Sequence, residues 1–189
     1  MSLYPEVQAA AQKELDTIIG TDHLPKIADC TQLPYMMVLC KEVFCWHVAS
    51  PTGSDRGPGI PHRARPDFIY DCEGSLPLFI PKDSLITPNI WLKMIHDPDR
   101  YANPMAFDPT RFIPTAGKAA EQDPVRMCFS FGRCQVFTFK ADRETVGKIL
   151  ADTTVFMACS TILAVFNMTK ARENGVVVEP PVGQADGTV

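Results

Sequence analysis

The sequence predicts a mainly α-helical fold with a small β component. Three stretches place apolar residues at helical spacing: one near the start of the chain, one ending near residue 47 and one beginning near residue 149. Between the second and the third lie short runs of β-branched and aromatic residues, and then a long stretch rich in proline and polar side chains. With 189 residues, the chain is long enough to bury a core and could form one or two ordinary domains.

The first two helices are predicted from their start and stop signals as well as from their apolar stripes. Pro5 suits the first helical position, Glu6 suits the positive end of the helix dipole, and Gly20 supplies a stop. The second helix is predicted to begin at Leu33-Pro34 and to run to about residue 47. The stripes consist of Val7, Ala11, Leu15 and Ile18 in the first helix and of Tyr35, Val38, Leu39 and Val43 in the second.

Short strands are predicted after these helices. They cover Asp67–Tyr70, Leu78–Ile80 and Ser84–Thr87, and the residues between the first two have turn composition. A helical turn is expected around Asn89–Ile95, followed by a long ordered loop that ends near residue 124. Residues 171–189 turn polar and are predicted to form a tail.

The third helix is predicted over Ile149–Phe166, inside the longest apolar stretch of the chain. A stretch of this length resembles a membrane span in composition. Polar side chains interrupt it, and we therefore expect a helix buried in a core and no membrane span in this chain. The interrupting residues are Asp152, Thr153, Thr154, Ser160 and Thr161.

The charge balance indicates which partners to expect, and the cysteine content indicates the cellular compartment. The 18 basic and 22 acidic side chains give a net charge of −4, and no basic block could follow nucleic-acid phosphates, so no nucleic-acid partner is expected. The seven cysteines form no CxxC pair and the chain does not start with a signal peptide, which indicates an intracellular, reducing compartment. Cys40, Cys45 and His47 lie close together in the sequence but match no common zinc spacing.

Three motifs carry most of the functional information. They are Lys41–His47 (KEVFCWH), Phe107–Phe112 (FDPTRF) and Phe129–Cys134 (FSFGRC). In this order and rough spacing they resemble the C-terminal part of a cytochrome P-450, a haem-thiolate monooxygenase, and most of all the fungal members of that family. The resemblance implies a C-terminal fragment with an incomplete P-450 fold. Residues 1–170 would be the C-terminal part of the P-450 domain, with loop-like insertions at about 48–60 and 134–146.

The resemblance also assigns residues to a haem (heme) site. In the family run F-x-x-G-x-R-x-C-x-G the cysteine sulfur is the axial ligand of the haem iron, which makes Cys134 the candidate for cofactor and metal binding. His62 matches a histidine that faces a haem propionate. Glu42 belongs to the helical E-x-x-R element, which forms a structural network with a second arginine, matched here by Arg111. No residue of this chain is assigned a catalytic role.

The sequence departs from the family at two places in this site. Cys45 stands where the helical arginine is expected. Counted from Phe129, the ligand position holds Val136, and 14 residues separate Gly132 from Gly147 where the family run leaves five. Family-like sequence on both sides of unrelated residues is typical of a mis-spliced or decayed gene product.

Two functions therefore stay open. By resemblance, the intact protein is a haem- and iron-binding monooxygenase that inserts one oxygen atom of O₂ into a small organic substrate, in fungal secondary metabolism or xenobiotic oxidation. Electrons would come from NADPH through a partner cytochrome reductase. Intact members are anchored to the endoplasmic reticulum membrane, and no anchor is expected in this chain. The alternative is a non-catalytic, truncated or mis-spliced pseudoenzyme that binds no haem, and the chain alone is expected to be inactive.

Overall fold

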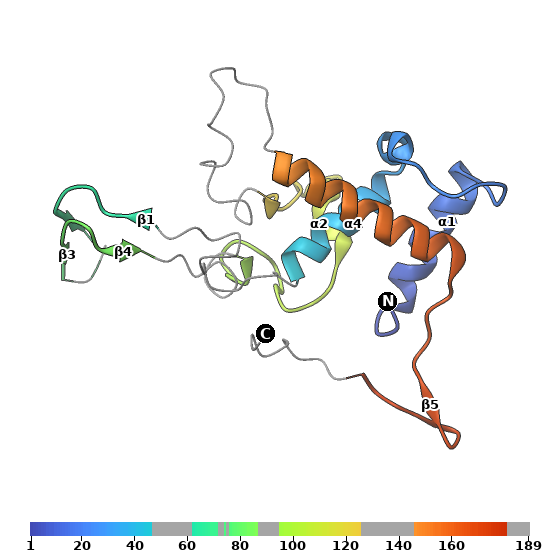
Figure 1. Ribbon diagram of the computed structural model, residues 1–189. Helices are drawn as coiled ribbons and strands as arrows, with labels where there is room; N and C mark the ends of the chain where they lie inside the picture. Colours follow the sequence, from blue (N-terminus) through green and yellow to red (C-terminus); the bar gives the residue numbers. More distant parts are fainter. Residues whose placement is uncertain (47–61, 72–73, 75, 87–94, 126–145, 181–189) are drawn as a thin grey trace.

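The computed structural model describes residues 1–46, 62–71, 74, 76–86, 95–125 and 146–180. Helices α1 (Pro5–Ile18), α2 (Pro34–Trp46) and α4 (Val146–Val165) lie together in one part of the molecule (Figure 1). Four short strands lie apart from it, namely β1 (His62–Arg63), β2 (Phe68–Tyr70), β3 (Leu78–Ile80) and β4 (Leu85–Ile86). The mainly α-helical class with a small β component is confirmed. The described residues also form two 3₁₀ helices, η1 (Ile27–Gln32) and η3 (Pro109–Phe112).

The helices begin and end within a few residues of the predicted bounds. Pro5 is the first residue of α1 and Glu6 lies in its first turn, as the start signals indicated. Gly20, which follows α1, has a φ angle of 80°, a left-handed conformation that residues with a Cβ rarely adopt. Local sequence signals therefore account for the bounds of this helix.

The core lies where α1, α2 and α4 pack against one another. Leu15 of α1 and Leu39 of α2 are almost completely buried there, as is Leu163 of α4. The other buried members of this cluster are Val7, Ala11, Leu33, Met36, Cys40 and Phe156. Burial of such side chains contributes roughly 1.5–3 kcal/mol each, which makes this three-helix contact the main source of stability among the described residues.

Polar side chains of α1 satisfy the ends of the two helices that pack against it. The carboxylate of Glu14 accepts hydrogen bonds from the backbone N–H groups of Tyr35 and Met36, both at 2.8 Å, at the start of α2. Gln12 donates to the carbonyl oxygens of Leu163 and Phe166 at the end of α4, at 3.2 and 3.1 Å. Because the terminal groups of a helix have no partner inside the helix, these bonds fix where α2 starts and α4 ends.

Helix α4 is not buried all round, contrary to the expectation of a buried core helix. One face packs into the core through Phe156, but Leu150 and Val165 are 65% and 56% exposed. The stretch Lys148–Val165 has a mean hydropathy of 1.5, and only 17% of it is buried. It is the one helix among the described residues that is long and apolar enough to cross a membrane by length and composition alone, a test that core helices of soluble proteins also pass.

The short strands form separate antiparallel pairs. Strands β2 (Phe68–Tyr70) and β3 (Leu78–Ile80) pair with each other, at the positions that the sequence predicted. The third predicted strand is β4 (Leu85–Ile86), which pairs with β1 (His62–Arg63), a strand that the sequence did not reveal. Most of the helical turn expected around residues 89–95 lies outside the described residues.

A hairpin follows α4 in the region where a polar tail was predicted. Its strands are β5 (Arg172–Glu173) and β6 (Val176–Val177), which pair antiparallel. The turn residues Asn174 and Gly175 have φ angles of 51° and 81°. Asn-Gly is the dipeptide that best fits a two-residue hairpin turn with two positive φ angles, so the signal for this hairpin was present in the sequence.

Candidate functional site

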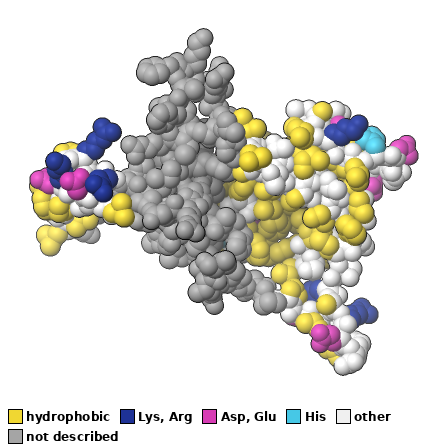
Figure 2. All heavy atoms as spheres, in the orientation of Figure 1, with side chains coloured by type: hydrophobic (Ala, Val, Ile, Leu, Met, Phe, Trp, Pro, Cys, Tyr) yellow, Lys and Arg dark blue, Asp and Glu magenta, His cyan; other side chains and the backbone are white. Residues whose placement is uncertain are grey.

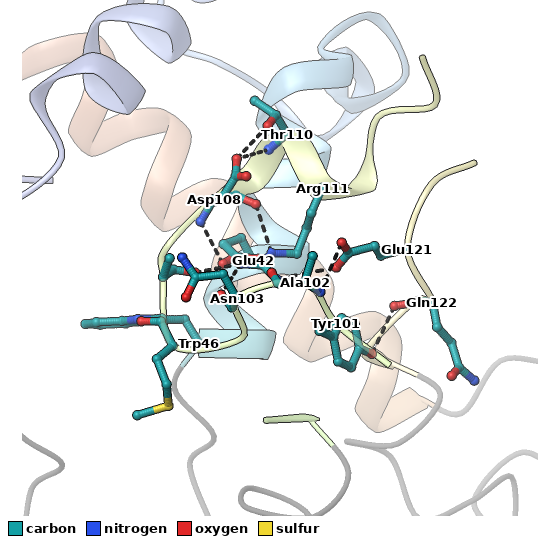
Figure 3. Close-up of polar contacts among 12 residues, drawn as sticks. Glu42, Trp46, Tyr101, Ala102, Asn103, Asp108, Thr110, Arg111, Glu121 and Gln122 are labelled. Carbon is teal, nitrogen blue, oxygen red and sulfur yellow. Dashed lines mark hydrogen bonds and ion pairs between the residues drawn. The ribbon is translucent and has the colours of Figure 1, made fainter. Parts of the chain in front are cut away.

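The buried centre of the candidate site is an ion pair between α2 and η3. Glu42 and Arg111 have side chains that are only 1% and 3% exposed, and Nε of Arg111 lies 3.2 Å from Oε2 of Glu42 (Figure 3). The two residues are far apart in the sequence, so the pair joins the second helix to the long loop. These are the two residues that the sequence assigned to a structural network.

Arg111 also holds the loop that precedes it. Its guanidinium donates hydrogen bonds to the carbonyl oxygens of Ala102 at 2.9 Å, Ala106 at 2.6 Å and Asp108 at 3.1 Å. A further ion pair joins its Nη1 to Glu121 at 3.4 Å. Because the planar guanidinium has five donors in a fixed arrangement, one buried side chain sets the conformation of residues 102–108.

The sequence Asp108-Pro109-Thr110-Arg111 explains how η3 forms. Asp108 is the N-cap residue and its carboxylate accepts a hydrogen bond from the backbone N–H of Thr110 at 2.9 Å, while Pro109 fits the first helical position. The backbone N–H of Asp108 donates to Oε1 of Glu42 at 2.9 Å. The cap therefore fixes the direction of Arg111, and Glu42 fixes the position of the cap.

The Glu42 carboxylate is buried, but its hydrogen bonds and ion pair do not fully offset the cost of burying its charge. Burial raises the pKa of Glu42 to about 7, although the hydrogen bond from Asp108 and the charge of Arg111 lower it. Oε2 receives no hydrogen bond from the described residues, since Nε of Arg111 lies at ion-pair distance but donates to the Asp108 carbonyl. Cys45 lies three residues along the helix and is 1% exposed. An arginine there would lie on the same face of the helix as Glu42.

The aromatic side chains beside this network join α1, α2 and the loop. The ring centroids of Tyr4 and Phe107 are 5.1 Å apart, and those of Trp46 and Phe107 are 5.6 Å apart. Nε1 of Trp46 also donates to the Met105 carbonyl at 3.2 Å. The loop is therefore attached to the helical core by packed rings as well as by the ion pair.

The proposed haem contacts lie outside this description. Cys134 is not among the described residues, and of His62 only the backbone, in β1 opposite Ile86, is described. Among the described residues, no group of three or more His, Cys, Asp or Glu side chains could hold a metal ion. The structure thus describes the Glu42–Arg111 network and not the proposed ligand loop.

Sequence reasoning missed two members of the loop network. Glu121 pairs with Arg111, and its Oε1 accepts the backbone N–H of Ala102 at 3.3 Å. The hydroxyl of Tyr101, which is completely buried, donates to the carbonyl of Gln122 at 3.0 Å. No local pattern marks these contacts, since they join loop residues that are between 10 and 21 positions apart.

Comparison with known proteins identifies the class. The family model of cytochrome P450 matches residues 1–182, and the chain therefore belongs to the cytochrome P450 family. The relatives named below are fungal proteins. Cytochrome P450 monooxygenase 208 of Postia placenta is 43% identical over 189 residues, which is 100% of this chain and 33% of the relative.

Two further relatives agree with this assignment. Cytochrome P450 monooxygenase claR of Ampulloclitocybe clavipes is 43% identical over 190 residues, or 100% of this chain and 32% of the relative. O-methylsterigmatocystin oxidoreductase of Aspergillus flavus is 39% identical over 167 residues, or 88% of this chain and 28% of the relative. The chain spans about a third of the length of the curated relatives that it matches.

Proposed function

We propose that this chain supplies the haem-supporting region of a cytochrome P450 monooxygenase, which inserts one oxygen atom of O₂ into a small organic substrate. NADPH would provide the electrons through a partner cytochrome reductase. The observation that carries the proposal is the buried Glu42–Arg111 pair at 3.2 Å, which attaches the long loop to α2. A buried pair of this kind is expensive to break, at about 3–5 kcal/mol, and suits a support that must hold a ligand loop in one place.

The cofactor of this proposal is haem, which when bound supplies the iron chemistry of oxygen insertion. Cys134 is the residue proposed to ligate the iron, and His62 is proposed to face a propionate. Thiolate ligation requires the cysteine loop to be held in a fixed approach, which is what the network of Glu42, Asp108 and Arg111 offers on the side of the described residues.

A second candidate is a non-catalytic form that binds no haem, and a specific observation favours it for the chain on its own. Oε2 of Glu42 has no hydrogen bond from the described residues, and the position from which an arginine could donate holds Cys45. The 14 residues between Gly132 and Gly147 add nine to the five of the family run. Both features weaken the ligand support at the point where haem binding needs it.

Sequencing the transcript across the codons for Arg133 and Thr145 tests the proposal. We expect an alternative junction that restores an R-x-C-x-G run. Its product should bind haem and give the ferrous–CO Soret band of a thiolate-ligated iron, and serine in place of the restored cysteine should abolish that band. The 189-residue chain supplied with haem is the comparison, and no such band is expected from it.

Two other outcomes decide between the candidates. A thiolate-type band from the 189-residue chain that is lost in Cys134→Ser, but kept in the control Cys30→Ser, would make Cys134 the ligand in this chain. The other outcome is that the transcript shows a single junction that lacks the R-x-C-x-G run, while the protein isolated from its source gives no ferrous–CO Soret band. That result would favour the second candidate, a non-catalytic protein that binds no haem.

A further inference from the structure

We propose that Cys40 and Cys159 form an oxidisable dithiol, a modification site at which a peroxide converts two thiols into a disulfide that joins α2 to α4. This site is separate from the Glu42–Arg111 network, and nothing in the monooxygenase proposal requires it.

Two helices that are distant in the sequence bring the two sulfur atoms together. Cys40 of α2 is 4% exposed and belongs to the hydrophobic core cluster, and Cys159 of α4 packs against the same cluster. Helices α2 and α4 pack against each other here, and the two thiols are near enough that each shifts the pKa of the other. Two neighbouring thiols on packed helices are the arrangement from which a disulfide forms with little backbone movement.

Only one of the two thiols can be reached from outside. Cys159 is half-buried and lines an apolar cavity of about 350 Å³, together with Trp46, Phe107 and Met168. Cys40 does not line this cavity and lies deeper in the core. Hydrogen peroxide is small and uncharged, so it can enter such a cavity and meets Cys159 first.

The directions of the two pKa shifts also indicate that Cys159 reacts before Cys40. The hydrogen bond from Cys40 lowers the pKa of Cys159, with the N-terminal ammonium acting in the same direction and burial opposing both. The same hydrogen bond, together with burial and the charge of Asp152, raises the pKa of Cys40 well above its ordinary range. Since the thiolate is the nucleophile, Cys159 is the attacking residue and Cys40 the resolving one.

The chemistry proceeds in two balanced steps. The Cys159 thiolate attacks one oxygen of hydrogen peroxide, the O–O bond breaks, and the sulfenic acid of Cys159 forms while hydroxide leaves and is protonated to water. The sulfur of Cys40 then attacks the sulfenic sulfur, the S–O bond breaks, and a second water leaves as the S–S bond forms. Two thiols lose two electrons in all, and one peroxide is reduced to two waters.

Peptide mapping of the full chain tests this assignment. The reduced protein is treated with hydrogen peroxide, alkylated and cut with trypsin after Lys26, Lys41, Lys148 and Lys170. The expected product is residues 27–41 disulfide-linked to residues 149–170. It should be lost in Cys40→Ser and in Cys159→Ser. It should be kept in Cys30→Ser, the matched control, because Cys30 and Cys40 lie in the same tryptic peptide.

Two results would overturn the proposal. One is a linked peptide that survives in Cys40→Ser and disappears in Cys30→Ser. The other is that both cysteines stay reduced in the wild-type chain at a peroxide concentration that oxidises added glutathione.

A measurement on the wild-type chain does not depend on how the variants fold. Phenylarsine oxide bridges two neighbouring thiols, so it should protect Cys40 and Cys159 together from alkylation by iodoacetamide. Alkylation of Cys159 at an unchanged rate in the presence of the arsenical would contradict the dithiol.

Discussion

Glu42 is a carboxylate whose desolvation outweighs its attraction to the nearest cation. Arg111 lies at 3.2 Å, yet the pKa of Glu42 is raised to about 7 because burial acts more strongly than the ion pair and the Asp108 hydrogen bond together. Buried ion pairs commonly show this balance when one lone pair is left without a donor. Cys45 lies three residues along α2, where the resemblance implies an arginine, and a guanidinium at that position could supply the missing donor.

The raised pKa of Glu42 predicts a pH dependence of stability. Its folded pKa of about 7 lies above the ordinary value of 4.5, so the folded state binds the proton more tightly than the unfolded state. This contribution to stability is complete below about pH 4.5 and is lost as the pH rises through 7, by about 3 kcal/mol at most. Urea unfolding from about pH 4.5 to 8 should show wild type losing stability relative to Glu42→Gln across this window.

The matched control for this measurement is Glu6→Gln, which removes an exposed carboxylate from the first turn of α1. The difference in unfolding free energy between wild type and Glu6→Gln should not show the pH dependence that is expected for Glu42→Gln. If the difference between wild type and Glu42→Gln is the same at every pH, Glu42 does not titrate with a raised pKa.

Placing the arginine of the family motif at position 45 should supply the hydrogen bond that the Glu42 carboxylate lacks. In Cys45→Arg a new guanidinium can donate to Oε2 of Glu42, and a hydrogen bond to a charged group contributes about 1.5–3 kcal/mol. The thermal unfolding midpoint should therefore rise in the wild-type background and rise less, or fall, in Glu42→Gln. Equal effects of Cys45→Arg in the two backgrounds would show that position 45 does not face the network.

At the scale of the elements, the cap of η3 connects a local sequence signal to the site. The Asp108 carboxylate accepts the N–H of Thr110 at 2.9 Å, and its loss should cost about 1 kcal/mol. We expect Asp108→Ala to lower the free energy of unfolding, measured by urea titration, by that amount. Asp108→Asn keeps an acceptor oxygen and should retain most of the stability, and an Asn variant as unstable as the Ala variant would show that charge, not the cap, matters.

The elements also show what the sequence could predict. Helices α1, α2 and α4 followed from periodicity and from caps such as Pro5 and Gly20, because these signals act within a few residues. Strand β1 was missed because its partner β4 lies more than twenty residues away and its two residues carry no alternation. The hairpin of β5 and β6 was missed although Asn174-Gly175 encodes its turn.

The candidate site likewise contains residues that the sequence predicted and a residue that it missed. Motif spacing led to Glu42 and Arg111, whereas Glu121 depends on how the loop folds back on Arg111, which no local pattern records. The family was predicted correctly from three motifs and is confirmed by the match over residues 1–182. The roles of Cys134 and His62 remain predictions, since the family motif alone supports them.

At the scale of the whole molecule, the described residues leave many large apolar side chains exposed. Hydrophobic side chains gather over the helical part of the molecule (Figure 2). Among the described residues, exposed apolar side chains lie on α4 and on the hairpin of β2 and β3. They include Ile69, Leu78, Phe79, Ile149, Leu150, Ile162, Val165 and Phe166.

This exposed apolar surface predicts that the isolated chain self-associates. Burial of apolar area stabilises by about 25 cal/mol per Å², so the exposed apolar side chains of α4 favour association or chaperone binding over a free monomer, and unfolding should be broad. Sedimentation velocity should show concentration-dependent oligomers that decrease in Leu150→Lys, where the side chain is 65% exposed. Thr154→Lys places the same charge at an exposed polar position of α4 and should leave association unchanged. A monodisperse wild-type monomer with one sharp unfolding transition would mean that these 189 residues cover the α4 face by themselves.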